Sequence, residues 1–124
     1  MEKRKILYVD DEKINLLLFE ANLEKKYTVL TAEDGISALE ILSENKDIEI
    51  VISDMRMPNM NGIEFIQCAT ELYPTISYYI LTGYDITDEI QKALNKGLIR
   101  RYFSKPFRIN EIISEIDTVL TAER

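Results

Sequence analysis

Histidine is absent from this 124-residue chain, and cysteine occurs once. Without histidine the chain cannot use histidine-based acid/base catalysis, build a Ser/His/Asp triad or carry a phosphohistidine. The one thiol, Cys68, has no intramolecular disulfide partner, which is typical of a reducing compartment. Any chemistry must therefore come from other groups, of which carboxylates are the most abundant.

Positive charge and long apolar runs are also scarce. The chain has 15 Lys and Arg against 22 Asp and Glu, a net charge of −7, so we expect no direct binding to nucleic acid or anionic lipid. Near the amino terminus only residues 6–9 form an apolar run before three acids, which is unlike an export signal. No segment approaches the ~20 apolar residues that span a bilayer. We therefore expect a cytoplasmic protein that does not enter a membrane.

The length fits one domain, residues 1–124, with no output domain. Short apolar runs alternate with longer segments of helical period, a pattern typical of helices that cover both faces of a parallel sheet. We therefore predict an α/β fold, a single doubly wound (βα)5 domain with five parallel strands. The predicted strands are 6–9, 27–31, 48–53, 77–81 and 101–103, with the second at an edge of the sheet.

Apolar residues three and four positions apart mark the predicted helices. The faces that we expect to be buried in the first and last helices are Ile14, Leu17, Leu18 and Ala21, and Ile109, Ile112, Ile113, Ile116, Val119 and Leu120. Between them, three helices are marked by Ala38, Ile41 and Leu42, by Phe65, Ala69 and Leu72, and by Ile90, Ala93 and Leu94. We expect Cys68 to pack in the core and Gly97 to end the fourth helix.

Ligands of an open parallel sheet bind at the carboxyl ends of its strands, so the residues at these ends are the informative ones. They are Asp10 and Asp11, Asp54, Thr82 and Lys105. Three neighbouring carboxylates repel one another, and without a cation at least one stays protonated. Hard oxygen ligands with no histidine nearby favour Mg²⁺, with Mn²⁺ as a substitute.

A carboxylate in such a site can attack phosphorus and form an aspartyl phosphate. The metal would neutralise charge on the transferred group, while Lys105 and the Thr82 hydroxyl could hold its other oxygens. Each residue also has an ordinary interpretation when taken alone. Asp10 and Asp11 could cap a helix, Asp54 and Thr82 could belong to turns, and Lys105 could be a surface charge. Their occurrence together favours the site.

Four short segments, in this order, resemble the receiver (CheY-like) domain of two-component response regulators. They are Val9-Asp10-Asp11, residues 54–62 (DMRMPNMNG), Leu81-Thr82-Gly83 and Lys105-Pro106. The resemblance covers nearly the whole chain and implies the strand order 2-1-3-4-5. It also implies a phosphoacceptor switch that is not a turnover enzyme, phosphorylated by a sensor histidine kinase or a phosphotransfer protein.

The resemblance implies a role for each site residue. Asp54 is the phosphoacceptor, Lys105 pairs with the phosphoryl group, and the metal is held by Asp10, Asp11, Asp54 and the backbone carbonyl of Arg56. Thr82 and Tyr102 would be a switch pair, although an aromatic residue in a strand can also serve packing alone. Phosphorylation would shift a two-state equilibrium. The readout face would be helix 4, strand 5 and helix 5, which could also form a homodimer or bind an effector or an attached output domain.

The chain departs from many relatives in two places. It has Asn61 where many have Asp, and the segment 96–102 is one residue longer before the switch aromatic. Lys105-Pro106 is commonly a cis peptide in this family. Arg56 and Tyr84 occupy positions that influence hydrolysis of the acyl phosphate. We hypothesise slow dephosphorylation, because the ring of Tyr84 can shield the site from water.

Three other functions are open to a chain of this pattern. A metal-dependent phosphatase with an aspartyl nucleophile usually has a second Asp two residues later, where this chain has Arg56. A flavodoxin-like nucleotide binder needs a phosphate-binding loop after the first strand, where the acids at 10–12 would repel phosphate. A receiver-like scaffold that is never phosphorylated is disfavoured because every acceptor-site residue is present.

Overall fold

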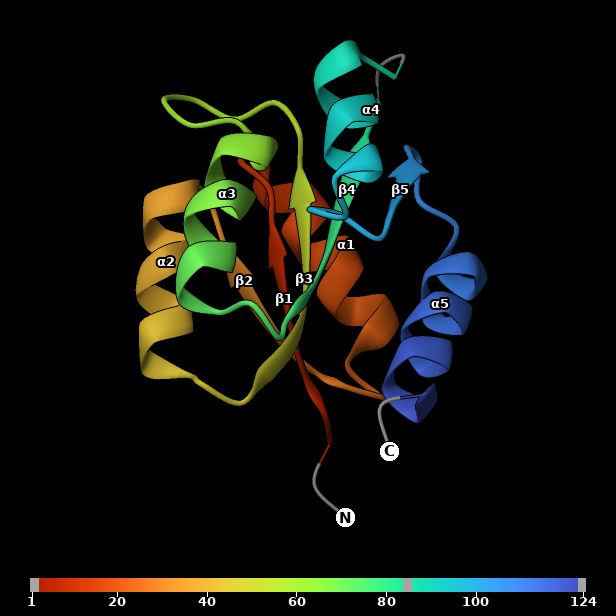
Figure 1. Cartoon of the computed structure of the whole chain (residues 1–124). Coiled ribbons are helices and arrows are strands. Elements are labelled where there is room, and N and C mark those ends of the chain that lie inside the picture. Colours follow the sequence, from red (N-terminus) through yellow and green to blue (C-terminus); the bar gives the residue numbers. More distant parts are fainter. Residues whose placement is uncertain (1–2, 84–85, 123–124) are drawn as a thin grey trace.

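Five parallel strands form one sheet in the order β2-β1-β3-β4-β5 (Figure 1). The computed structural model describes residues 3–83 and 86–122. The strands are β1 Lys5–Val9, β2 Thr28–Ala32, β3 Ile48–Asp54, β4 Ser77–Thr82 and β5 Arg101–Ser104. Each lies within one residue of its predicted bounds, and β2 is an edge strand as expected. The predicted fold class and strand order are confirmed.

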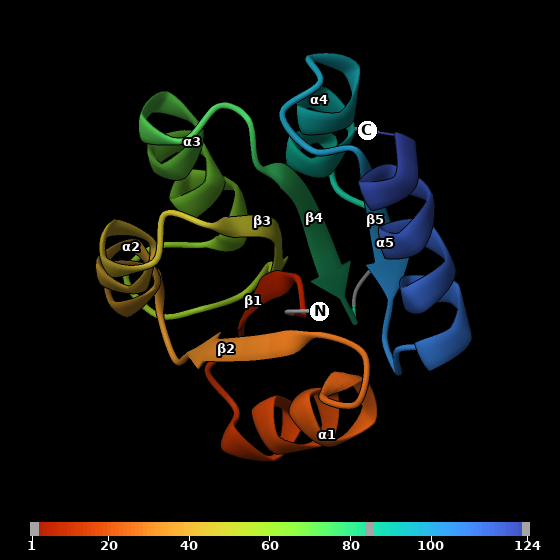
Figure 2. The same cartoon turned by 90° about the horizontal axis from the view of Figure 1, so that it is seen from below.

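Helices cover both faces of the sheet (Figure 2). They are α1 Lys13–Leu23, α2 Gly35–Glu44, α3 Gly62–Leu72, α4 Asp88–Asn95 and α5 Ile109–Ala122. Helices α2, α3 and α4 pack on one face, and α1 and α5 on the other. None of the helices in the described ranges is long and apolar enough to cross a bilayer.

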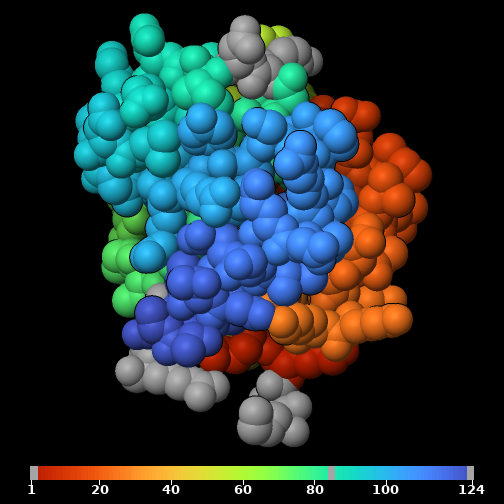
Figure 3. Space-filling model, turned by 90° about the vertical axis from the view of Figure 1, so that its right-hand side faces the viewer, coloured from red at the N-terminus to blue at the C-terminus, as the bar shows by residue number. Residues whose placement is uncertain are grey.

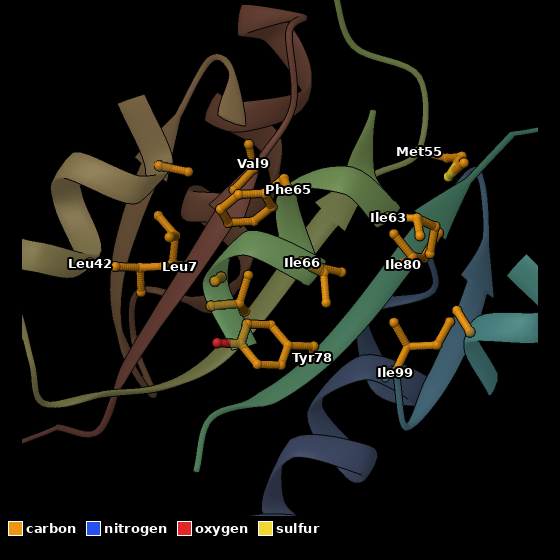
Figure 4. Close-up of a cluster of buried hydrophobic side chains, with 14 of the residues drawn as sticks. Leu7, Val9, Leu42, Met55, Ile63, Phe65, Ile66, Tyr78, Ile80 and Ile99 are labelled. Atoms are coloured by element: carbon orange, nitrogen blue, oxygen red, sulfur yellow. The ribbon is translucent and has the colours of Figure 1, made fainter. Parts of the chain in front are cut away.

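Two apolar layers hold the helices on the sheet, because successive side chains of a strand point to opposite faces. In β1, Leu7 and Val9 enter the layer under α2 and α3 (Figure 4), whereas Ile6 and Tyr8 enter the layer under α1 and α5. All four side chains are fully buried. The sheet is therefore the rigid base from which the strand-end loops project.

The predicted core face of α1 is wrong. Ile14, Leu17 and Leu18 are 59%, 63% and 48% exposed, and Ala21 is also exposed. The buried face consists of Leu16, Phe19 and Leu23. Both sets recur at helical spacing, so periodicity could not choose between them. The choice is made by packing against β2 and α5, and it leaves an apolar stripe on the surface of α1.

The prediction for α3 needs a smaller correction. Phe65 and Ala69 are buried as expected, but Leu72 is 67% exposed and Cys68 is an exposed free thiol. Ile63 and Ile66 complete the buried face instead. The predicted end of α4 is correct: Gly97 has φ +75°, and its N–H donates to the carbonyl of Leu94.

Helix α5 is attached to the rest of the molecule along its length, and its predicted core face is largely buried. Toward its amino end, Arg101 of β5 forms ion pairs with Glu111 (3.8 Å) and Glu115 (3.4 Å). Toward its carboxyl end, Asp117 accepts hydrogen bonds from Lys26 and Tyr27, which lie between α1 and β2. Polar contacts thus hold both halves of this helix.

Candidate functional site

The predicted site residues meet at the carboxyl edge of the sheet. Asp10 follows β1, Asp54 and Thr82 end β3 and β4, and Lys105 follows β5. Asp10, Asp54 and Thr82 are 0%, 6% and 1% exposed. Parallel strands bring their carboxyl ends together, which is why residues far apart in sequence share this edge.

Three carboxylates cluster at this edge, and we call the place where they meet the notch. Asp10, Asp11 and Asp54 each place a carboxylate oxygen within 4.8 Å of the others. Asp11 is exposed, so the notch opens to solvent on its side. Hard oxygen donors at this spacing, without sulfur or imidazole, match the ligands that Mg²⁺ prefers.

Lys105 bridges two of these carboxylates. Its Nζ lies 3.2 Å from Asp10 Oδ2 and 3.2 Å from Asp54 Oδ1. The peptide bond from Lys105 to Pro106 is cis, and the Lys105 N–H donates to the carbonyl of Thr82 at 2.8 Å, which ties this segment to the end of β4. Burial lowers the pKa of the ammonium, but Asp54 and Asp10 outweigh burial and hold the pKa above its usual value. Lys105 is therefore a permanent cation in the notch.

One ammonium does not balance three carboxylates. Burial and the charge of Asp10 raise the pKa of Asp54 from 3.8 to about 6, and Lys105 offsets only part of this rise. The negative charge of the notch is thus only partly balanced at neutral pH. A divalent cation would relieve the repulsion, so the residues fit the metal that the sequence predicts.

The raised pKa of Asp54 makes stability depend on pH. Its folded pKa, about 6, exceeds the unfolded value of 3.8, so in that interval the folded state binds more protons than the unfolded state. Without Mg²⁺, the free energy of unfolding should therefore fall by about 2 kcal/mol as pH rises from about 4 to 7. Urea unfolding at several pH values, with EDTA, measures this fall. Asp54→Asn should remove it, and an equal slope in both proteins would contradict the assignment.

Asp10 is held by more donors than the sequence suggested. Its Oδ2 accepts from the Tyr8 hydroxyl at 2.6 Å and from the Asn15 amide at 3.2 Å, and its Oδ1 accepts from the Glu12 N–H at 3.0 Å. Sequence reasoning missed Tyr8 and Asn15. A signal existed for Tyr8, because residues two apart in a strand point to the same face and Tyr8 lies two before Asp10.

The loop from β3 to α3 lies against the strand that carries Asp54. Asn61 caps α3: its side chain accepts from the Glu64 N–H, and the Glu64 carboxylate accepts from the Asn61 N–H, both at 2.9 Å. The Asn61 amide also donates to Glu89 of α4 at 3.3 Å. At Gly62 a Cβ would lie 2.4 Å from the carbonyl oxygen of Asp54. Only glycine can come this close to the carbonyl of Asp54, because it has no Cβ.

The predicted switch residues lie on neighbouring strands. Thr82 is opposite Ser104 in the pairing of β4 with β5, and Tyr102 is half-buried against the α4 side of the core. Tyr102 also lines a surface groove of about 550 Å³ with Arg101, Arg108 and Glu111. Arg56 is exposed, and Tyr84 lies outside the described residues. The structure thus places Thr82 at the notch, and Tyr102 on the neighbouring strand β5, in the face formed by α4, β5 and α5.

Comparison with known proteins gives consistent matches over nearly the full length. The family model for the response regulator receiver domain matches residues 6–117. The chain is 35% identical to sporulation initiation phosphotransferase F of Bacillus subtilis over 113 residues, which is 90% of each chain. It is also 38% identical over 120 residues to the sensor histidine kinase RcsC of Escherichia coli, but spans only 12% of that protein.

Solved structures show the same fold. A response regulator receiver domain protein from Clostridium thermocellum superposes with a TM-score of 0.89 and 30% identity, covering 96% of this chain and 95% of that one. The likeness therefore extends over all five strand-and-helix units.

Proposed function

This chain belongs to the response regulator receiver domain family, and we propose that it is a phosphoacceptor switch in which Asp54 receives a phosphoryl group with the help of Mg²⁺. The donor would be a sensor histidine kinase or a phosphotransfer protein. One observation carries the proposal. Asp54, nearly buried in an acidic notch, lies 3.2 Å from the bridging ammonium of Lys105.

The geometry suits attack by Asp54 on phosphorus. One carboxylate oxygen forms a bond to phosphorus while the bond from phosphorus to the donor breaks, and the donor leaves with that electron pair. Lys105 would follow the phosphoryl oxygens, because its ammonium already contacts Asp54 Oδ1. Thr82, at the end of the adjacent strand, offers a hydroxyl to the same group.

The metal would be held by Asp10, Asp11, Asp54 and the backbone carbonyl of Arg56, with Mn²⁺ as a substitute for Mg²⁺. When bound, it would supply positive charge that balances the carboxylates and the transferred phosphoryl group. We infer a switch rather than a turnover enzyme, because Arg56 stands where an aspartyl phosphatase carries its acid/base. A cytoplasmic location belongs to the proposal and suits an exposed, unpaired Cys68.

The signal would leave through the face formed by α4, β5 and α5, which Figure 3 shows. Thr82 at the notch and Tyr102 on this face lie on the paired strands β4 and β5. A shift of Thr82 toward a phosphoryl group would therefore change the surroundings of Tyr102. The face would then contact an effector, an output domain or a second copy of the chain.

The test is phosphorylation by a small donor. Incubation with acetyl phosphate and Mg²⁺ should add one phosphate per chain, detected by intact mass. Omitting Mg²⁺ or adding EDTA should prevent the gain, because the notch then repels the donor. A chain that gains no phosphate at any Mg²⁺ concentration would refute the proposed function.

The stripe on α1 is the surface that best suits docking of the phosphodonor protein. Ile14, Leu17 and Leu18 are exposed, and Leu18 borders a hollow of about 560 Å³ that also touches Tyr8 and Lys105. Large apolar side chains seldom gather on a free surface without a partner. Their position beside the notch would let a docked helix present its phosphohistidine to Asp54.

Leu17→Glu should lower the rate of transfer from the phosphorylated donor protein, a cognate sensor histidine kinase or phosphotransfer protein, about tenfold or more, because it charges the apolar stripe. Transfer from acetyl phosphate should be unchanged. Leu72→Glu is the matched control, since Leu72 is an equally exposed helical leucine, at the far end of α3 from the notch. Equal transfer rates for both variants would argue against docking on α1.

A further inference from the structure

We infer that Tyr8 is a positioning residue for the metal site: its hydroxyl holds the carboxylate of Asp10 in the orientation that binding requires. The inference rests on the proposed function, because it concerns the same Mg²⁺ site. It assigns to Tyr8 a role that packing alone would not give.

The Tyr8 side chain is held at its hydroxyl by Asp10 and at its ring by Phe19. Tyr8 and Asp10 are both fully buried, and the hydroxyl donates to Asp10 Oδ2 at 2.6 Å. The Tyr8 ring stacks on Phe19 of α1 at 4.2 Å and 17°, and Phe19 in turn contacts Phe107 edge-on at 5.6 Å. The donor therefore reaches Asp10 from a ring that cannot swing away without moving α1.

Asp10 depends on such donors because it is a buried carboxylate. Its Oδ1 accepts from the Glu12 N–H, and its Oδ2 accepts from Asn15 and Lys105 in addition to Tyr8. Lys105 is shared with Asp54, so it is not a dedicated support for Asp10. Tyr8 makes the shortest of these contacts, and it comes from the rigid strand β1. Partners that orient ligating carboxylates typically contribute about 10–100-fold to metal affinity.

Packing does not explain the hydroxyl. The Tyr8 ring stacks on the phenyl ring of Phe19 within a core layer of aliphatic and aromatic residues, against which phenylalanine would pack as well. The contact that tyrosine adds is the bond to Asp10. Tyr8→Phe therefore separates the positioning role from the packing role.

The experiment compares Tyr8→Phe with Tyr79→Phe. Tyr79 is also fully buried, belongs to the same core layer, and donates its hydroxyl to a carboxylate, Glu115 of α5, at 2.9 Å. The Mg²⁺ dissociation constant is measured by titrating MgCl₂ into ¹⁵N-labelled protein and following backbone amide shifts, without a phosphodonor. Tyr8→Phe should weaken binding about tenfold, whereas Tyr79→Phe should leave it unchanged.

If the wild type binds Mg²⁺ and Tyr8→Phe binds it with the same dissociation constant, the inference is overturned and the proposed function stays intact. Absence of binding by wild type would overturn both. Asn15→Ala is a second variant, needed if Tyr8→Phe does not fold: it removes the Asn15 donor to Asp10 at a helical position that tolerates alanine, and should weaken binding by a smaller factor. In that case unchanged Mg²⁺ binding by Asn15→Ala would show that metal binding does not depend on donors that hold Asp10, and this would overturn the inference, which rests on that dependence.

Discussion

Asp54→Ala should gain no phosphate from acetyl phosphate and Mg²⁺, with uptake at background. The reason is that the three carboxylates of the notch are not equivalent. Both oxygens of Asp10 already accept hydrogen bonds from surrounding donors, and Asp11 is exposed to water. Asp54 is nearly buried, and its carboxylate pairs with the ammonium of Lys105. It is the carboxylate best placed for attack.

Two controls separate loss of the acceptor from other effects. Asp11→Ala should reduce uptake through weaker metal binding but recover with more Mg²⁺. Asp47→Ala removes an exposed acid just before the start of β3, at the end opposite the notch, and should not change uptake. Intact mass measures all three variants. A full gain of one phosphate by Asp54→Ala would show that another residue is the acceptor.

Gly62→Ala should lower the free energy of unfolding by about 2–4 kcal/mol. An added Cβ would lie 2.4 Å from the carbonyl oxygen of Asp54 and 2.8 Å from Ile80 Cδ1. The first contact is with backbone, so relief requires a shift of β3 or of the start of α3. That shift would also strain the bond from the Gly62 N–H to the carbonyl of Met55. The greater helix propensity of alanine is too small to compensate.

Gly83→Ala is the matched control for this prediction. A Cβ at Gly83 would meet only the side chain of Lys105, at 3.7 Å, which is an ordinary van der Waals contact. Urea unfolding followed by circular dichroism measures both variants. A loss for Gly62→Ala within about 0.5 kcal/mol of that for Gly83→Ala would contradict the steric argument.

The sheet could be predicted from sequence because its strands are short, apolar and bounded by charged or small residues. Runs such as the one at 48–53 have no helical alternative of adequate length, and all five strands were placed within one residue. The site residues followed from the same logic, since Asp10, Asp54, Thr82 and Lys105 all stand at strand ends. These features depend on local pattern and on the shared edge of a parallel sheet.

The surface of α1 could not be predicted in this way. The segment from Lys13 to Leu23 contains two apolar sets at helical spacing, and burial of Phe19 rather than Leu17 depends on how the helix rotates against the sheet. Hydrophobic periodicity shows that a helix is amphipathic, but it cannot distinguish a core face from a docking face. The support of Asp10 by Asn15 was missed for a related reason: it depends on how α1 sits beside β1.

The attachments of α5 bear on which part of the proposed output face, formed by α4, β5 and α5, can move. Arg101 of β5 forms ion pairs with the amino half of this helix. Lys26 and Tyr27, next to the edge strand β2, donate hydrogen bonds to Asp117 in its carboxyl half. On the other side of the face, α4 is joined to the acceptor loop through an exposed contact between Glu89 and Asn61. We therefore expect that moving α4 on this face costs less free energy than moving α5. In this arrangement α5 would stay in place while α4 moves, and a bound partner would respond to the position of α4.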